Sequence, residues 1–121
     1  MAEKLVIMCT HGPEDPERAT IPFVMATAAQ AADVEVIIGL QVDGVRLAAK
    51  GGADGVAAPS FPALKDLFKA YFEAGGKLLV CGPCVQSRKI DPKKDFVDAA
   101  TVVGAATFVQ CCTEATNVLV Y

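Results

Sequence analysis

The sequence contains no tryptophan, a single histidine and no long run of one charge. No basic stretch exceeds two residues, as at Lys93-Lys94, and 11 lysines and arginines against 14 aspartates and glutamates leave a net charge of −3. Proteins that bind nucleic acid through its phosphates need clustered positive charge. We therefore expect no nucleic-acid partner.

Long apolar runs are also missing. No stretch approaches the ~18 apolar residues of a membrane-spanning helix, and the apolar residues 5–8 are too few for a secretion signal. We therefore expect no membrane association and a cytoplasmic location. Five cysteines, an odd number in a chain without such a signal, argue against a disulfide framework and for reduced, reactive or ligating thiols.

The chain has no internal repeat and no low-complexity linker, and its 121 residues suit one domain spanning residues 1–121. Its hydrophobic content of 53% is high for a soluble monomer of this size. Excess apolar side chains can lie in contacts between subunits. We therefore expect a homo-oligomer.

The most informative stretch is the apolar run at residues 78–80 and the Cys81-Gly82-Pro83-Cys84 that follows it. Apolar residues without alternation are typical of a strand buried on both faces of a parallel sheet. Because proline suits the first turn of a helix, Cys81 should end a strand and Cys84 should begin a helix. The helix N-terminus, together with Arg88 one turn later, would then favour a thiolate.

Similar patterns predict alternating strands and helices along the whole chain. Strands are expected at residues 4–9, 34–40, 77–81, 101–103 and 118–121, and helices at 17–32, 45–50, 61–74 and 105–115. Pro22 should restrict the first helix to later residues or kink it, and Ser60 should cap the third. Residues 51–60 should form a loop over the site, and residues 90–95 a polar connector.

This alternation predicts an α/β fold, a parallel sheet with helices on both faces. Reactive groups in such sheets gather at the carboxyl ends of the strands, in the crevice where the strand order switches. Cys9 and His11 follow the first strand, as Cys81 and Cys84 follow the third. We therefore expect Cys9 and His11, together with Gly82 and Pro83, to form a binding site around the Cys81/Cys84 pair.

The cysteines have two other interpretations, as inert packing residues or as a thioredoxin-like pair. Inert packing suits Cys111 and Cys112, which lie in the middle of a predicted helix, but not a pair separated by Gly-Pro and followed by Arg88. Cys-Gly-Pro-Cys is also the thioredoxin tetrapeptide. In a thioredoxin this motif comes early in the chain, with a tryptophan before it and a cis-proline in a long segment after it. This chain has no tryptophan, has the motif two thirds of the way along and has only Pro92 after it. These differences argue against a thioredoxin.

Metal binding is a further alternative. Cys9, His11, Cys81 and Cys84 would make a tetrahedral zinc set if the first and third strands were neighbours. A second Cys-x-x-Cys or a histidine pair is missing, so we expect no metal and no cofactor. A competing functional hypothesis is a non-enzymatic oligomeric module that senses thiol redox state, or binds metal, through Cys81 and Cys84.

Four motifs, in their order along the chain, resemble the DsrE/DsrF-like family, including its YchN-like branch. They are residues 12–20 (GPEDPERAT), 43–45 (DGV), 74–84 (AGGKLLVCGPC) with Arg88 and Ile90, and 114–119 (EATNVL). The resemblance implies a three-layer α/β/α fold with a five-stranded, mainly parallel sheet, and assembly into homotrimers or homohexamers. It also implies sulfur relay, in which a cysteine accepts a sulfane sulfur as a persulfide and passes it on.

The family's sulfur-carrying cysteine ends a strand seven residues before an Arg-Gly, which corresponds to Cys81 with Arg88, although Lys89 stands here in place of the glycine. Cys84 matches the second cysteine of the YchN-like Cys-x-x-Cys. The resemblance therefore implies a persulfide carrier or sulfurtransferase that holds sulfur on Cys81. Cys84 would act as the resolving thiol, and a small sulfur-containing donor or a partner relay protein would supply the sulfur.

Overall fold

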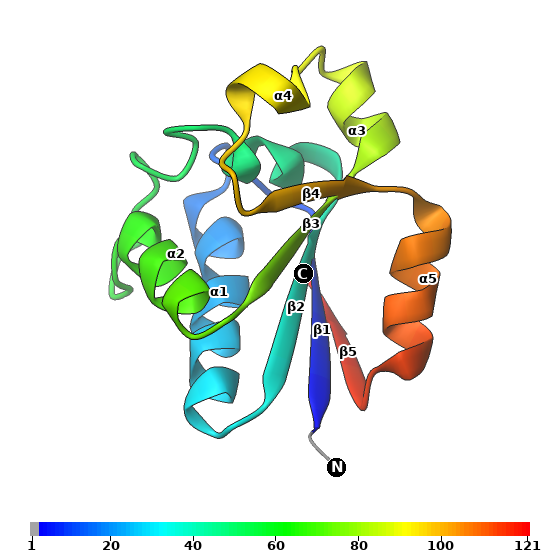
Figure 1. The fold of residues 1–121 in the computed structure, drawn as a ribbon. Helices are drawn as coiled ribbons and strands as arrows, with labels where there is room; N and C mark the ends of the chain where they lie inside the picture. Colours follow the sequence, from blue (N-terminus) through cyan, green and yellow to red (C-terminus); the bar gives the residue numbers. More distant parts are fainter. Residues whose placement is uncertain (1–2) are drawn as a thin grey trace.

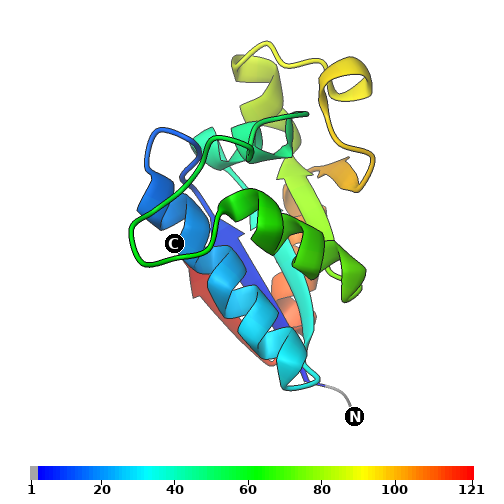
Figure 2. The same cartoon turned by 90° about the vertical axis from the view of Figure 1, so that its left-hand side faces the viewer.

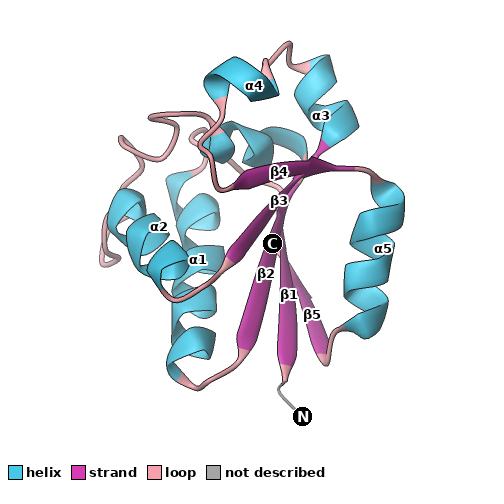
Figure 3. Cartoon of the chain, in the orientation of Figure 1, coloured by secondary structure: helices cyan, strands magenta, loops and turns pink. Residues whose placement is uncertain are grey.

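Five parallel strands form a single sheet in the computed structural model, which describes residues 3–121 (Figures 1 and 3). The strands are β1 (Lys4–Cys9), β2 (Glu35–Leu40), β3 (Lys77–Cys81), β4 (Ala100–Val103) and β5 (Asn117–Val120). Their order across the sheet is β4-β3-β2-β1-β5, and every neighbouring pair is parallel. The carboxyl ends of all five strands therefore meet at one edge.

Helices cover both faces of this sheet. Helices α1 (Pro16–Ala31) and α2 (Leu64–Glu73) lie on one face, and α5 (Ala105–Glu114) lies on the other (Figures 1 and 2). The 3₁₀ helix η1 (Val42–Ala48) and the short helices α3 (Gly82–Ser87) and α4 (Pro92–Asp95) lie at the carboxyl edge. This three-layer arrangement confirms the predicted α/β fold. Across residues 3–121, none of the helices has both the length and the apolar character needed to cross a bilayer.

Tyr71 of α2 connects the helical layer to the sheet through its buried ring and its hydroxyl group. Its ring is fully buried and meets Phe23 of α1 edge to face, with centroids 5.7 Å apart. Its hydroxyl accepts a hydrogen bond from the Ile38 amide at 3.1 Å and also contacts the carbonyls of Val36 and Lys77. Burial raises the pKa of the phenol, so it stays protonated and can donate. One side chain therefore connects α2 to both β2 and β3.

The first helix differs from its prediction. Helix α1 begins at Pro16, and Asp15 caps it by accepting a hydrogen bond from the Arg18 amide at 3.2 Å. Pro22 is buried inside the helix, so the prediction that it would restrict the helix to later residues is wrong. A proline there removes one backbone hydrogen bond, and the side-chain packing of this helix against the core outweighs that loss.

The start of α2 also differs from its prediction. The helix begins at Leu64 and not near residue 61, and Ser60 does not cap it, because Ser60 has a left-handed backbone with φ 71°. The cause is Pro62, which disfavours helical geometry at the residue before it. Residues 51–60 contain no helix or strand, as predicted.

Two elements at the carboxyl edge were placed incorrectly from the sequence. A helix was expected at residues 45–50, whereas η1 begins three residues earlier, at Val42. Gly44 makes this possible, because a Cβ at that position would overlap the Cys9 carbonyl at the end of β1. The connector at residues 90–95 contains the short helix α4, which begins after the N-cap Asp91.

Replacing Tyr71 by phenylalanine should lower the free energy of unfolding by about 1–3 kcal/mol, because the buried Ile38 amide would lose its partner. Urea denaturation would measure the change. Tyr121→Phe is the matched control, since its hydroxyl makes no hydrogen bond within residues 3–121, and it should change stability by less than about 0.5 kcal/mol. Equal losses in the two variants would contradict this account of Tyr71.

Candidate functional site

The two cysteines of the Cys-x-x-Cys lie on either side of the junction between β3 and α3. Cys81 is the last residue of β3, and α3 begins directly at Gly82, with Pro83 in its first turn. Both cysteines are half-buried and neither forms a disulfide. The predicted strand end and helix start are therefore confirmed, and Gly82 and Pro83 connect the two thiols at the carboxyl edge of the sheet.

The sulfur of Cys84 has a backbone hydrogen-bond donor from another element. The Val42 amide at the start of η1 donates to Cys84 Sγ, with 3.2 Å between nitrogen and sulfur. Val42 has a φ of 54°, which is uncommon for a β-branched residue and indicates strain. Its side chain is exposed. This unusual backbone conformation aims an N–H group at a thiol.

Arg88 holds α3 against η1. Its Nε donates to Asp43 Oδ1 at 2.9 Å, and its Nη1 donates to the carbonyl oxygen of Cys84 at 3.2 Å. Arg46 approaches the same Asp43 oxygen at 3.5 Å. The hydrogen bond from Arg88 is the main reason that the pKa of Asp43 lies below its usual value. Asp43 is therefore an ionised anchor for the arginine that contacts the Cys84 backbone.

The pKa of Cys81 is shifted in the direction opposite to the one expected from the sequence. The pKa of Cys81 is raised, first by burial and then by the neighbouring Cys84 thiol. The backbone amide of Cys84 and the charge of Arg88 act in the opposite direction, as a helix N-terminus and a cation should. Because burial outweighs both, Cys81 is held mainly as a neutral thiol at neutral pH, and not as the thiolate that the sequence predicted.

Cys9 and His11 do not join the Cys81/Cys84 pair. Strand β2 lies between β1 and β3, so the first and third strands are not the neighbours that the zinc set required. Cys9 is fully buried, its thiol donates to the His11 carbonyl at 3.3 Å, and burial raises its pKa to about 11. The His11 ring nitrogen contacts the Thr10 hydroxyl at 3.1 Å. Within residues 3–121, no group of three or more His, Cys, Asp or Glu residues is placed to hold a metal ion.

The site also lies away from the place where the strand order switches. That switch lies between β1 and β5, because β2, β3 and β4 follow β1 in one direction and β5 pairs on its other side. The cysteine pair is at the end of β3, two strands away. Cys111 and Cys112 of α5 are half-buried against the apolar cluster around Phe108, which confirms their predicted packing.

Two members of the site were not identified as such from the sequence. Asp43 was noted only within a short motif, although an acidic residue just after a buried strand brings a carboxylate to the carboxyl edge. Val42 contributes a backbone N–H, a group that nearly every residue has. The left-handed conformation that makes it a donor to Cys84 has no signal in the residue type.

The model of a family described as the DsrE/DsrF-like family matches residues 3–121. Two proteins of Methanocaldococcus jannaschii, both described as uncharacterized, are similar in sequence. MJ0760 is 35% identical over 106 residues, which are 88% of this chain and 38% of that protein, so the chain spans about two fifths of that relative's length. MJ0989 is 29% identical over 119 residues, covering 98% of this chain and 99% of that protein.

Two solved structures share the fold. The YchN protein of Escherichia coli has a TM-score of 0.80 and 16% identity, and the match covers 98% of this chain and 99% of that one. MTH1491 of Methanobacterium thermoautotrophicum, a protein described as of unknown function, has a TM-score of 0.77 and 14% identity with the same coverage. At these identities the likeness concerns the arrangement of helices and strands.

The raised pKa of Cys81 predicts how its alkylation depends on pH. The rate of Cys81 labelling by iodoacetamide, followed by peptide mapping, should rise with a midpoint above the ordinary thiol value of about 8.5, because the buried site disfavours the thiolate. In urea the midpoint should fall back to that value. Cys9 serves as an internal comparison and should stay unlabelled in the folded protein. A Cys81 midpoint at or below the ordinary value would show that burial does not dominate.

Proposed function

Because this chain belongs to the DsrE/DsrF-like family, whose membership indicates a role related to sulfur relay, we propose that it is a cysteine-persulfide carrier or sulfurtransferase. In this proposal Cys81 holds the sulfur and Cys84 is the resolving thiol. The observation that carries it is the position of the two cysteines on either side of the junction of β3 and α3, at the carboxyl edge of the sheet.

The first step loads Cys81. The thiolate, which is the minor form of Cys81 at neutral pH because burial raises its pKa, attacks the outer sulfur of a donor persulfide, R–S–SH. The donor leaves as the thiol R–SH after taking up a proton. The transferred sulfur keeps its oxidation state, so this step needs no oxidant or reductant. The product is a Cys81 persulfide, which is more acidic than a thiol. The Cys84 amide and Arg88 both favour a negative charge on Cys81, so they would also favour the persulfide anion.

The second step releases or transfers the sulfur. When the Cys84 thiolate attacks the inner sulfur of the Cys81 persulfide, a Cys81–Cys84 disulfide forms and hydrosulfide leaves with the electron pair. An external dithiol must then reduce the disulfide before another cycle. Without that attack, the outer sulfur can pass to the thiol of an acceptor protein. An amide donor bonds more strongly to an anionic sulfur than to a neutral one, which supports Val42 as a partner for Cys84.

The proposed setting is a homotrimer or homohexamer in the cytoplasm, where thiols stay reduced. Family members often oligomerise. In this chain, exposed valines on β4, α5 and β5 support contact between subunits, with Val102, Val109, Val118 and Val120 from 39% to 70% exposed. The donor is a small sulfur compound or a partner relay protein.

Mass spectrometry of the intact reduced protein after exposure to a persulfide donor tests the role of Cys81. We expect one or more added sulfur atoms, mapped to the peptide that contains Cys81. Cys81→Ser should abolish the addition, because no other thiol would be loaded, and Cys9→Ser should retain it. Sulfur carried on Cys84 instead would reverse the two roles. A loss of two hydrogens at Cys81 and Cys84 without added sulfur would favour the non-enzymatic redox module.

Sulfide release tests the role of Cys84. The Cys84→Ser variant should retain sulfur on Cys81 and release at least about tenfold less hydrosulfide, since a serine hydroxyl cannot form the disulfide that expels it. Methylene-blue assay of sulfide, alongside the mass of the protein, would measure both quantities. Cys112→Ser is the control with a half-buried cysteine on another face. Unchanged release from Cys84→Ser would contradict the resolving role.

A further inference from the structure

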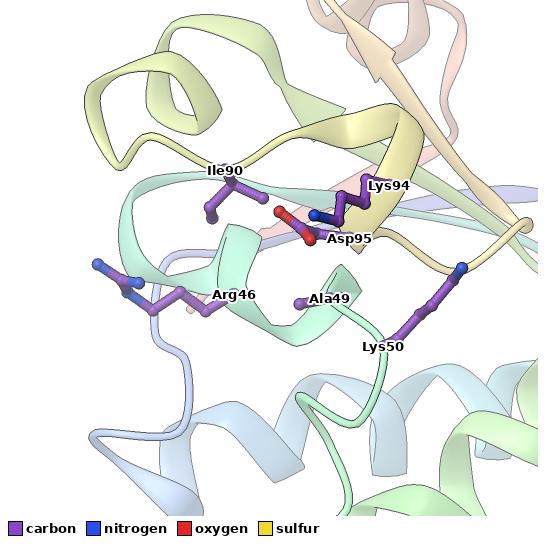
Figure 4. A pocket seen from close by; sticks show the side chains of 6 residues that line it. All are labelled: Arg46, Ala49, Lys50, Ile90, Lys94 and Asp95. Carbon is purple, nitrogen blue, oxygen red and sulfur yellow. The ribbon is translucent and has the colours of Figure 1, made fainter.

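A cavity of about 420 Å³ lies at the same edge of the sheet as the cysteine pair. It lies between η1 and α4, and its lining residues are Arg46, Ala49, Lys50, Ile90, Lys94 and Asp95 (Figure 4). In Figure 4 Arg46 and Lys50 lie on either side of Ala49, whereas Ile90, Lys94 and Asp95 come from the segment around α4. Its volume is within the range of about 300–1,000 Å³ that is typical of small-molecule sites.

Backbone hydrogen bonds hold the two walls of this cavity together. The Lys50 amide donates to the Asp95 carbonyl at 2.6 Å, and the Val97 amide donates to the Ala48 carbonyl at 2.9 Å. Ala49 and Phe96 form an antiparallel bridge between these contacts. The end of η1 and the end of α4 are therefore fixed to each other, and the cavity is formed before any ligand binds.

The residues around the cavity are positively charged in an otherwise acidic chain. Residues 42–50 and 88–95 contain six of the 11 lysines and arginines but only three of the 14 acidic residues. Cavities that concentrate one sign of charge attract ligands of the opposite sign. This distribution favours an anionic ligand.

Of the three acidic residues in these segments, only Asp43 is in an ion pair in the part of the chain that the structure describes, and the cavity lining itself contains three cationic side chains and one carboxylate, that of Asp95. Asp43 pairs with Arg88, as described above. The Asp91 carboxylate accepts from the Lys93 amide, and the Asp95 carboxylate accepts from the Asp91 amide, each at 3.0 Å. Within residues 3–121, neither Lys50 nor Lys94 makes an ion pair. The two ammonium groups are therefore available to a ligand.

We propose that this cavity binds the body of the sulfur donor, a low-molecular-weight thiol persulfide that carries carboxylate or phosphate groups. Lys50 and Lys94 would contact the negative charges, and Ala49 and Ile90 would contact the apolar stem. That the ligand is a persulfide rests on the proposed function, whereas binding of an anionic thiol compound rests on the cavity alone.

A chain of contacts connects this cavity to the cysteine pair. Arg46 lines the cavity and lies 3.5 Å from the Asp43 oxygen that accepts the Arg88 hydrogen bond, and Arg88 contacts the Cys84 carbonyl. Ile90 packs against the same apolar core as Cys81 and Cys84. A donor bound in the cavity would therefore lie beside the residues that position α3.

Binding of S-methylated compounds, which cannot transfer sulfur, tests the cavity without any reaction. The probes are S-methylglutathione, with carboxylates, and S-methyl-coenzyme A, with phosphates. The counterparts without acidic groups are the diethyl ester of the first and S-methylpantetheine, which lacks both the phosphates and the adenosine of the second. Amide chemical shifts should change at residues 46–50 and 90–95 with at least one anionic probe, and its ester or dephosphorylated counterpart should bind much more weakly. The probe that binds identifies the carboxylate or the phosphate class.

Paired charge removals locate the site. The double variant Lys50→Gln with Lys94→Gln should weaken binding of the anionic probe about tenfold, because each lost contact contributes a modest amount. Lys65→Gln with Lys69→Gln on α2 removes the same charge from two exposed residues away from the cavity and should change the affinity by less than about twofold. The proposal would be overturned if neither anionic probe bound or if the counterparts without acidic groups bound equally well. It would also be overturned if the two double variants lost the same affinity.

This measurement also separates the two proposals. Binding in the cavity by a protein that gains no sulfur on Cys81 would support the anion site and reject the persulfide carrier. If the protein gains sulfur on Cys81 but binds neither anionic probe, the persulfide carrier is supported and the anion site is rejected.

Discussion

The parallel pairing of all five strands is the constraint on which the site depends. Because every strand runs in the same direction, segments that follow β1, β2 and β3 in the sequence all emerge at one edge. The thiol pair follows β3, whereas Val42, which donates to the Cys84 sulfur, and Asp43, which accepts from Arg88, follow β2. The parallel sheet therefore brings two segments that are distant in the sequence to the same edge, where contacts between them complete the site.

Contacts with η1 hold the second cysteine in place. Helix α3 has six residues, too few to be stable in isolation. Its position depends on the buried Val85, on the hydrogen bond between Arg88 and Asp43, and on the hydrogen bond that the Val42 amide donates to the Cys84 sulfur. Any chemistry that changes the charge or bonding of Cys84 thus acts on one of the few contacts that fix α3.

The sequence was sufficient to predict features that depend on local pattern. Apolar runs predicted the strands, and Gly82-Pro83 predicted that Cys81 would end a strand and Cys84 would begin a helix. It was not sufficient where distant parts of the chain decide. The insertion of β2 between β1 and β3 separates Cys9 from Cys81, and the burial that raises the pKa of Cys81 depends on the whole packed edge. The left-handed backbone of Val42 likewise has no signal in its residue type.

The hydrogen-bond donor to the Cys84 sulfur is the main-chain N–H of Val42, so the side chain of that residue takes no part in this contact. The amide of Val42 donates to the sulfur, while its side chain is exposed to solvent. Substitutions of that side chain, other than by proline, leave the N–H group in place. The side chain at this position can therefore change while the N–H group that donates to the Cys84 sulfur is kept.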